Sequence, residues 1–210
     1  RQVIMESYCV SYPTSLGGDF TIWFINKHFG VEQKGFVGFD DMYVFKSPHI
    51  FRNYFEDSFV DENFPKQFPK KFAYKISFGY KGFGHSCILP IKRERKVDDE
   101  IKRVEEDFPN TRFIFLTCSD VNSNLAKMYI QRRFMLDKIA TESEYKTMME
   151  MYNERVNYKN GFPLCLDKLL SKDEMHYNEL LDFINEQPID NWKEDMNYYN
   201  NEIVKKYDLL

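Results

Sequence analysis

The residues whose types and spacing best suit chemistry lie near the start of the chain, in a short segment of hydroxyl side chains and glycines. The segment reads Ser11-Tyr12-Pro13-Thr14-Ser15-Leu16-Gly17-Gly18, and it lies between a β-rich run and a helical repeat over residues 19–29. A loop between a strand and a helix start can bind an anion, because backbone N–H groups and the helix dipole point into it. Glycine lets a ligand approach the backbone closely. The segment therefore predicts a site for a phosphate-bearing ligand.

The spacing argues against an ordinary ATPase or kinase. The Walker pattern G-x-x-x-x-G-K-[ST] is absent, because no lysine follows Gly17-Gly18. No predicted strand carries a clear carboxylate for magnesium either. Two glycines after a strand also suit a tight turn without a ligand, and that interpretation stays open.

The same segment resembles the phosphosulfate-binding loop of the sulfotransferase family, which usually reads T-Y-P-K-S-G-T-T-W. Later segments lie in the order of that family's second strand, its "fPnakiIyl" strand and its 3′-phosphate helix; they are His85–Pro90, Phe108–Leu116 and Ser123–Arg133. The C-terminal stretch around Leu169, Leu180, Phe183 and Ile184 resembles the closing helices. The resemblance spans most of the chain and is strongest to the short, divergent sulfotransferase-like proteins of marine phages.

Predicted strands alternate with predicted helices, which indicates an α/β fold with a parallel sheet. The resemblance implies one sulfotransferase-like domain over residues 1–210, a three-layer sandwich around a central, mainly parallel, P-loop-like sheet. An irregular aromatic-rich insertion occupies about residues 31–84. The implied cofactor is 3′-phosphoadenosine 5′-phosphosulfate, and the implied reaction is sulfuryl transfer to a hydroxyl or amine of a small molecule, carbohydrate or protein. The residues expected to bind this nucleotide are Thr14, Ser15, Leu16, Gly17, Gly18, Asp19, Ser123 and Arg132.

Several positions depart from the family's pattern. Thr14 stands where the loop lysine is expected, and Leu16 replaces the glycine that follows the loop serine. No arginine stands at the end of the central strand, where the sequence is Thr117-Cys118-Ser119-Asp120. Charge could come from the following helix, through Lys127, Arg132 or Arg133, although these also suit a solvated surface. The alternative is therefore a catalytically inactive module that binds a ligand or serves as a virion-associated interaction domain.

Four histidines offer candidates for a general base. His85 follows a glycine-rich run and begins a predicted strand, so it is the candidate that would accept the acceptor's proton. A structural, hydrogen-bonded role for His85 is the alternative. His28 suits the C-terminal dipole of the first helix, His49 could line an acceptor pocket, and His176 is interpreted as structural.

Composition sets broad limits. Hydrophobic residues make up 43% and charged residues 30%, and the net charge of −4 argues against a general nucleic-acid binder. The four cysteines form no C-x-x-C pair, so we expect reduced thiols, no metal site and a cytoplasmic setting, which is the host's if the protein is viral. No apolar run reaches the ~18 residues of a membrane span. The sequence indicates no oligomeric state.

The predicted elements follow from hydrophobic periodicity and breakers. The sequence predicts strands within residues 3–12, 72–78, 85–90 and 112–117, and a hairpin over 36–45. It predicts helices over residues 19–29, 92–107, 173–184 and 191–207. It also predicts a long helix from residue 120, with a continuation or a second helix that runs to about residue 156. Gly161-Phe162-Pro163-Leu164 is interpreted as a break after a helix.

Overall fold

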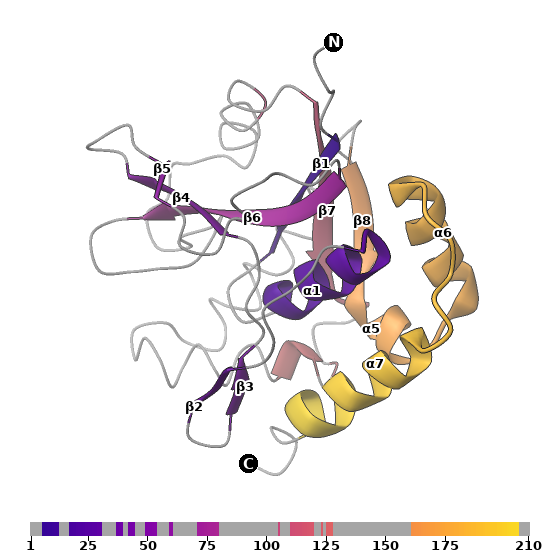
Figure 1. Ribbon diagram of the computed structural model, residues 1–210. Helices are drawn as coiled ribbons and strands as arrows, with labels where there is room; N and C mark the ends of the chain where they lie inside the picture. Colours follow the sequence, from indigo (N-terminus) through magenta and orange to yellow (C-terminus); the bar gives the residue numbers. More distant parts are fainter. Residues whose placement is uncertain are drawn as a thin grey trace. The chain divides into compact units, whose positions relative to one another are not determined.

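The computed structural model describes residues 6–12, 17–30, 37–39, 42–44, 49–53, 59–60, 71–79, 105, 110–119, 123, 125–127 and 161–205. The chain, drawn in Figure 1 with its helices and strands labelled, divides by its internal contacts into two compact units. The first comprises residues 1–12 and 18–114, and the second comprises residues 13–17 and 115–210. The predicted strand over 85–90 and most of the predicted helical stretches over 92–107 and 120–156 lie outside the described residues.

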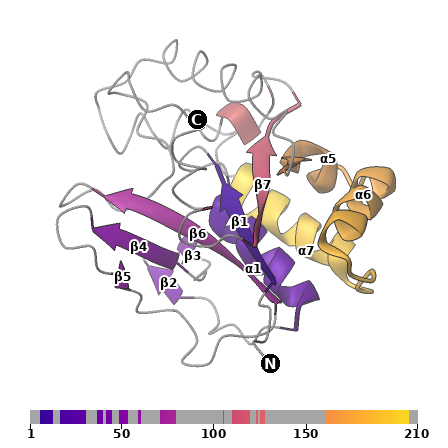
Figure 2. The same ribbon diagram turned by 90° about the horizontal axis from the view of Figure 1, so that it is seen from above.

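The first unit contains strands in the order β5-β4-β6-β1, followed by the first part of β7. Their bounds are β1 Glu6–Ser11, β4 His49–Asn53, β5 Phe59–Val60, β6 Lys71–Gly79 and β7 Thr111–Thr117. β6 pairs in parallel with β1 on one side and with β4 on the other, as Figure 2 shows, whereas β5 is antiparallel to β4. A parallel sheet with helices is the hallmark of an α/β protein, so this part of the prediction is confirmed.

Helix α1, Gly18–His28, follows β1 and packs on β6 and β1 within the first unit (Figure 1). Its buried side presents Phe20, Ile22, Phe24 and Ile25. The helix ends as the sequence predicts, because Gly30 takes a left-handed φ of 64° and its N–H donates to the Lys27 carbonyl. The predicted hairpin is also present, with β2 Val37–Phe39 antiparallel to β3 Met42–Val44.

The second unit contains the last part of β7, its neighbour β8 Gly161–Cys165, and a set of C-terminal helices. The helices are α5 Leu166–Leu170, α6 Glu174–Ile184 and α7 Trp192–Tyr199, and α7 continues into one π-helical turn over Asn200–Val204. α6 packs beside β8, and α5 contacts both α6 and α7 (Figure 1). The prediction of two C-terminal helices is confirmed, with α7 shorter than predicted.

Residues 161–164, interpreted as a break after a helix, form strand β8, which the sequence analysis did not predict. Gly161 and Pro163 suggested a break, yet both fit this strand. β8 is the last strand in the sheet order, and an edge strand tolerates proline because one side of its backbone needs no partner. A Cβ on Gly161 would lie 2.3 Å from the ring of Phe115, so glycine is required for that ring to pack on the strand.

The core of the second unit is apolar and aromatic. Tyr177 of α6 stacks on Trp192 of α7 with ring centroids 4.1 Å apart, and both side chains are buried. Asp173 caps α6 by accepting the N–H of His176, and Asn185 ends the helix in a left-handed conformation. None of the helices in the described ranges has the length and apolar composition of a membrane span.

Candidate functional site

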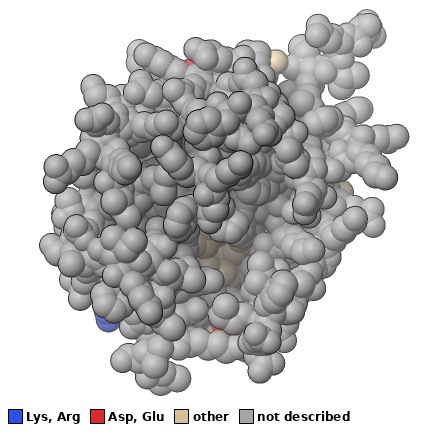
Figure 3. Space-filling model, turned by 90° about the vertical axis from the view of Figure 1, so that its left-hand side faces the viewer, with Lys and Arg blue, Asp and Glu red and all other residues tan. Residues whose placement is uncertain are grey.

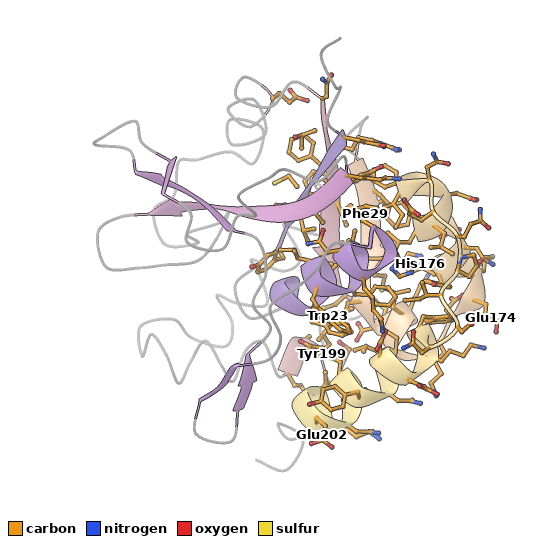
Figure 4. The ribbon with its side chains drawn as sticks, in the orientation of Figure 1. Trp23, Phe29, Glu174, His176, Tyr199 and Glu202 are labelled. Atoms are coloured by element: carbon orange, nitrogen blue, oxygen red, sulfur yellow. The ribbon has the colours of Figure 1, made fainter. Side chains whose placement is uncertain are left out.

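Gly17 closes the loop that the sequence predicts as an anion site. Its φ is 82°, a left-handed conformation that favours glycine. A Cβ at this position would lie 2.7 Å from Leu166 Cδ2 and 2.8 Å from the Tyr199 hydroxyl oxygen, both of which belong to the second unit with Gly17. Tyr199 lies at the end of α7 (Figure 4). The end of the loop is therefore held against the start of α5 and the end of α7.

Gly18 begins α1, and its reason for being glycine is different. A Cβ there would lie 2.0 Å from the Cζ of Tyr12, inside the ring, and the Tyr12 side chain is buried. The ring of Tyr12 thus lies directly on the first residue of the helix, within the first unit. Both glycines of the predicted motif allow close packing, and the loop enters a helix N-terminus as predicted.

Three of the predicted ligand-binding residues of the loop lie outside the described part of the chain, and a fourth lies at the start of α1. Thr14, Ser15 and Leu16 lie outside the described residues, so their predicted contacts with a nucleotide stay predictions. Asp19 lies in the first turn of α1, where a helix directs N–H groups outward along its axis.

The ends of β7 and β8 are joined by a carboxylate. Asp167 Oδ2 accepts two hydrogen bonds from Ser119, one from its N–H at 3.0 Å and one from its hydroxyl at 3.2 Å. Ser119 follows β7 by two residues and Asp167 follows β8 by two residues, so both strands end at the same edge. Gly17 packs on Leu166, the residue between β8 and Asp167, and the loop therefore ends beside this edge. The carboxyl edge of an α/β sheet is where such proteins bind ligands.

Two thiols lie at the same edge, at the strand ends. Cys118 follows β7, and Cys165 ends β8; both are buried and unpaired by disulfides. Burial raises the pKa of the Cys118 thiol most, and the Asp167 carboxylate raises it further. Burial likewise raises the pKa of Cys165. Thiols held in the neutral form are poor nucleophiles, so they serve packing here.

Ser123, the predicted 3′-phosphate residue, acts as a helix cap in this structure. Its hydroxyl accepts the N–H of Ala126 at 3.2 Å, and its carbonyl accepts the N–H of Lys127 at 2.9 Å. The side chain of Lys127 is exposed. Arg132 and Arg133 lie outside the described residues, so the predicted role of Arg132 stays a prediction.

Two cations gather at the amino ends of β1, β6 and β7 in the first unit. Glu6 and Lys71 are register partners at the starts of β1 and β6, and they form an ion pair of 3.9 Å. The ammonium of Lys71 and the guanidinium of Arg112 also lie 5.9 Å and 5.7 Å from the ring centroid of buried Tyr8. Burial and a hydrogen bond with Glu6 raise the pKa of the Tyr8 phenol. This cluster holds the amino ends of the strands together within the first unit.

No protein-family model matches the chain, and no curated protein matches its sequence. The function therefore has to be inferred from the residues and their geometry. Within the described ranges, no group of three or more His, Cys, Asp and Glu residues could hold a metal ion. On the face in Figure 3, the visible described charges are isolated, and described lysine and arginine side chains do not gather there.

The histidines have separate surroundings. His85, the predicted base, lies outside the described residues, and His49 begins β4. His28 is buried in the last turn of α1, where Nδ1 lies 2.8 Å from the Phe24 carbonyl oxygen and the ring packs edge-on against Phe24. A carbonyl only accepts, so Nδ1 carries the proton, and His28 satisfies the end of the helix as expected.

Sequence reasoning identified His176 as structural but missed what it connects. Nε2 lies 3.0 Å from the backbone nitrogen of Cys165, and Nδ1 lies 3.0 Å from Glu179 Oε2. It also missed Asp167, because residues 161–164 were not interpreted as a strand and the position after that strand carried no significance. The spacing His176-x-x-Glu179 on one helix face was the available signal for the first pair.

Proposed function

We propose that this chain binds 3′-phosphoadenosine 5′-phosphosulfate through the loop between β1 and α1 and transfers its sulfuryl group to a hydroxyl or amine acceptor. The observation that carries the proposal is the arrangement around Gly17: a parallel strand leads through a left-handed glycine into a helix N-terminus. The end of this loop lies beside the carboxyl edge of β8, where an α/β sheet binds its ligands. On this proposal the sheet is the centre of a three-layer, P-loop-like fold.

The donor set in and after the loop suits a phosphate. The hydroxyls of Thr14 and Ser15 and the N–H groups of the first turn of α1 are hydrogen-bond donors to anionic oxygens. Such donors hold the 5′-phosphate and stabilise the charge that develops there as the sulfuryl group leaves. His85 is the proposed base for the acceptor, and Ser123 and Arg132 are proposed to hold the 3′-phosphate.

A specific observation favours a second candidate, an inactive module that keeps the binding loop. Thr14 occupies the position at which the resembled family carries its lysine, so the loop supplies no charge for the leaving group. At the carboxyl edge, the described polar pair of Ser119 and Asp167 adds a carboxylate, which disfavours a second anion nearby. This candidate binds a nucleotide, or a partner such as a virion protein, without transfer.

Thermal-shift titration with adenosine 3′,5′-bisphosphate tests the binding step. A ligand that binds only the folded state raises the melting temperature by mass action. Wild-type protein and the Ser171→Ala variant, which alters an exposed hydroxyl on α5's C-terminal side, should show the same shift, and Ser15→Ala should lose most of it. Absence of any shift at millimolar nucleotide would refute the proposal.

A transfer assay separates the two candidates once binding is established. Radiolabelled phosphosulfate nucleotide is incubated with the protein and a panel of phenols, oligosaccharides and tyrosine peptides. Transfer that is lost in His85→Ala, with nucleotide binding retained, supports the enzyme. Binding without transfer to any acceptor class supports the inactive module.

A further inference from the structure

His176 joins helix α6 to strand β8 through both nitrogens of its ring. Nε2 lies 3.0 Å from the Cys165 backbone nitrogen at the end of β8, and Nδ1 lies 3.0 Å from the Glu179 carboxylate on α6. The His176 side chain, labelled in Figure 4, is only 6% exposed. Its ring stacks on Phe162 of β8 with centroids 5.7 Å apart. The imidazole is therefore a buried connector between two elements of the second unit.

The partners fix the protonation state of the ring. A backbone N–H can only donate, so Nε2 must present its lone pair to Cys165. A carboxylate accepts, so the ring's single proton must lie on Nδ1 and be donated to Glu179. The structure thus requires neutral His176 in the Nδ1–H form. A doubly protonated ring has two donors and no acceptor, and it cannot keep the bond to Cys165.

The groups at the two ring nitrogens of His176 respond in opposite ways when the ring takes up a second proton. On α6 the acidic neighbours are Glu179, which is about half exposed and lies at Nδ1, and the cap Asp173, which accepts the backbone N–H of His176. β8 contributes the thiol of Cys165 and the apolar face of Phe162. The charged residues of α5, Asp167 and the exposed Lys168, act electrostatically on Cys165. Cys165 is buried, so its N–H loses its described partner in a place with little access to water. Protonation therefore removes a buried hydrogen bond at the β8 end while strengthening the ion pair on α6.

The bonded residue lies beside the predicted ligand loop. Cys165 directly precedes Leu166, and the Cδ2 atom of Leu166 is the atom that a Cβ on Gly17 would approach to 2.7 Å. The His176–Cys165 bond fixes the backbone immediately before the side chain on which the loop packs. Loss of this bond would therefore act on the residue next to Leu166, on which Gly17 packs.

We propose that His176 is a proton-sensitive latch: its neutral ring holds the end of β8, and with it Leu166, in place through the bond from the Cys165 N–H to Nε2. Addition of a second proton turns Nε2 from acceptor to donor, and the end of β8 then loosens where it supports Gly17. This property does not depend on the identity of the ligand, so it can be tested without any nucleotide.

Ring-nitrogen NMR of the full chain tests the starting state. At pH 7.5, long-range nitrogen–proton spectra should show Nδ1 protonated and Nε2 unprotonated for His176, and the Cys165 amide should be protected from exchange. As the pH is lowered, the same spectra report when the His176 ring takes up its second proton, and over that step the Cys165 protection factor should fall at least about tenfold as the hydrogen bond is lost. A ring protonated at Nε2 at pH 7.5, or a protection factor that does not change, would overturn the proposal.

Urea unfolding at one pH above and one pH below this step tests the energetic consequence. Gln at position 176 presents an amide oxygen as acceptor and cannot be protonated, so His176→Gln keeps a partner for Cys165 at both values. Acidification should raise the unfolding equilibrium constant of the wild type about tenfold more than that of His176→Gln. Equal pH dependence of the two proteins would count against the latch.

His28 supplies the matched control. It is also a buried helical histidine, but Nδ1 donates to the Phe24 carbonyl and can do so in either charge state. His28→Asn, which keeps a donor near the Nδ1 position, should leave the difference between these two pH values as large as in the wild type. A His28→Asn variant that abolishes the difference would assign the effect to α1 and overturn the assignment to His176.

Discussion

The side chain of Asn26 forms hydrogen bonds with both the backbone N–H and the backbone carbonyl of Ala73. Its Nδ2 donates to the Ala73 carbonyl at 2.9 Å, and its Oδ1 accepts the Ala73 N–H at 2.7 Å. Both residues are fully buried, one in α1 and the other in β6. The planar amide therefore does what the backbone of an adjacent strand would do. β4 pairs with β6 only from Lys75 onward, so Asn26 satisfies a part of β6 that precedes this ladder.

Asn26→Ala should be among the most destabilising single substitutions in the first unit. It leaves a buried donor and a buried acceptor without the partner they now have, and the expected loss in the free energy of unfolding is about 3 kcal/mol. Urea denaturation followed by circular dichroism measures the change. Asn197→Ala, at an exposed position of α7, is the control and should change stability by less than about 0.5 kcal/mol. A loss of similar size in both variants would contradict this interpretation of Asn26.

Asn26→Asp sharpens the same prediction through its pH dependence. An ionised carboxylate accepts the Ala73 N–H but has no proton for the carbonyl, whereas a neutral carboxyl group can serve both. Burial raises the folded-state pKa of such a carboxyl, so its stability is present below about pH 3.9 and is lost as pH rises through the folded value. Relative to wild type, Asn26→Asp should therefore be more destabilised at pH 7 than at pH 4. The opposite trend would show that the site is open to water.

The sequence allowed the regular elements around Asn26 to be predicted, and the reason is periodicity. The β-rich run through Tyr12, the alternation over residues 72–78 and the apolar run over 112–117 correspond to β1, β6 and β7. The helical repeat before Gly30 corresponds to α1 within one residue at each end. Each of these patterns is local. The bond from Asn26 to Ala73 spans 47 residues, and no local pattern distinguishes an asparagine that will meet a strand from one that faces solvent.

The candidate site could be predicted only in part, for a related reason. The loop glycines are conspicuous in sequence, and both occupy a strand-to-helix junction as expected. Asp167 could not be recognised as a residue of the site, because its position matters only as the end of β8. Gly161 and Pro163 made that strand look like a break in the sequence. An edge position makes the proline acceptable, and the ring of Phe115 makes the glycine necessary, but neither fact is visible before the strands are paired.

Gly17→Ala should destabilise the protein more than Gly30→Ala, although both glycines have positive φ. The left-handed conformation costs an alanine about 1 kcal/mol at either position. At Gly17 the new Cβ also meets Leu166 Cδ2 at 2.7 Å and the Tyr199 hydroxyl at 2.8 Å, whereas at Gly30 nothing lies within 4 Å. Crowding of this kind adds about 1–3 kcal/mol. Urea denaturation of the two variants isolates the packing contribution as their difference, and equal losses would refute the close contact at Gly17.

Gly18→Ala should show a strong coupling with Tyr12. In the wild type a Cβ at Gly18 would lie inside the Tyr12 ring, at 2.0 Å from Cζ, and the expected loss of stability is about 3 kcal/mol. In a Tyr12→Ala background the ring is gone, and alanine's better helix propensity should make Gly18→Ala neutral or stabilising by up to about 1 kcal/mol. A double-mutant cycle measures the coupling directly. Additive effects would show that the ring does not cover the start of α1.

Cys118 should resist alkylation in the folded protein. Burial, followed by the Asp167 carboxylate and by Cys165, raises the pKa of its thiol above the ordinary range, and only the thiolate reacts. With iodoacetamide at pH 8, peptide mass spectrometry should find Cys118 modified at least about tenfold more slowly in the native protein than in urea. Asp167→Asn removes the charge but keeps oxygen as an acceptor for Ser119, so native labelling should become faster while remaining slower than in urea.

The same thiol should make the stability of the protein depend on pH in the alkaline range. Because its folded-state pKa is raised, Cys118 contributes stability that is present below the ordinary thiol value of about 8.5 and is lost as pH rises above it. Cys118→Ala should accordingly flatten the alkaline decline in stability, and rapid native labelling at pH 8 would contradict the buried, neutral thiol.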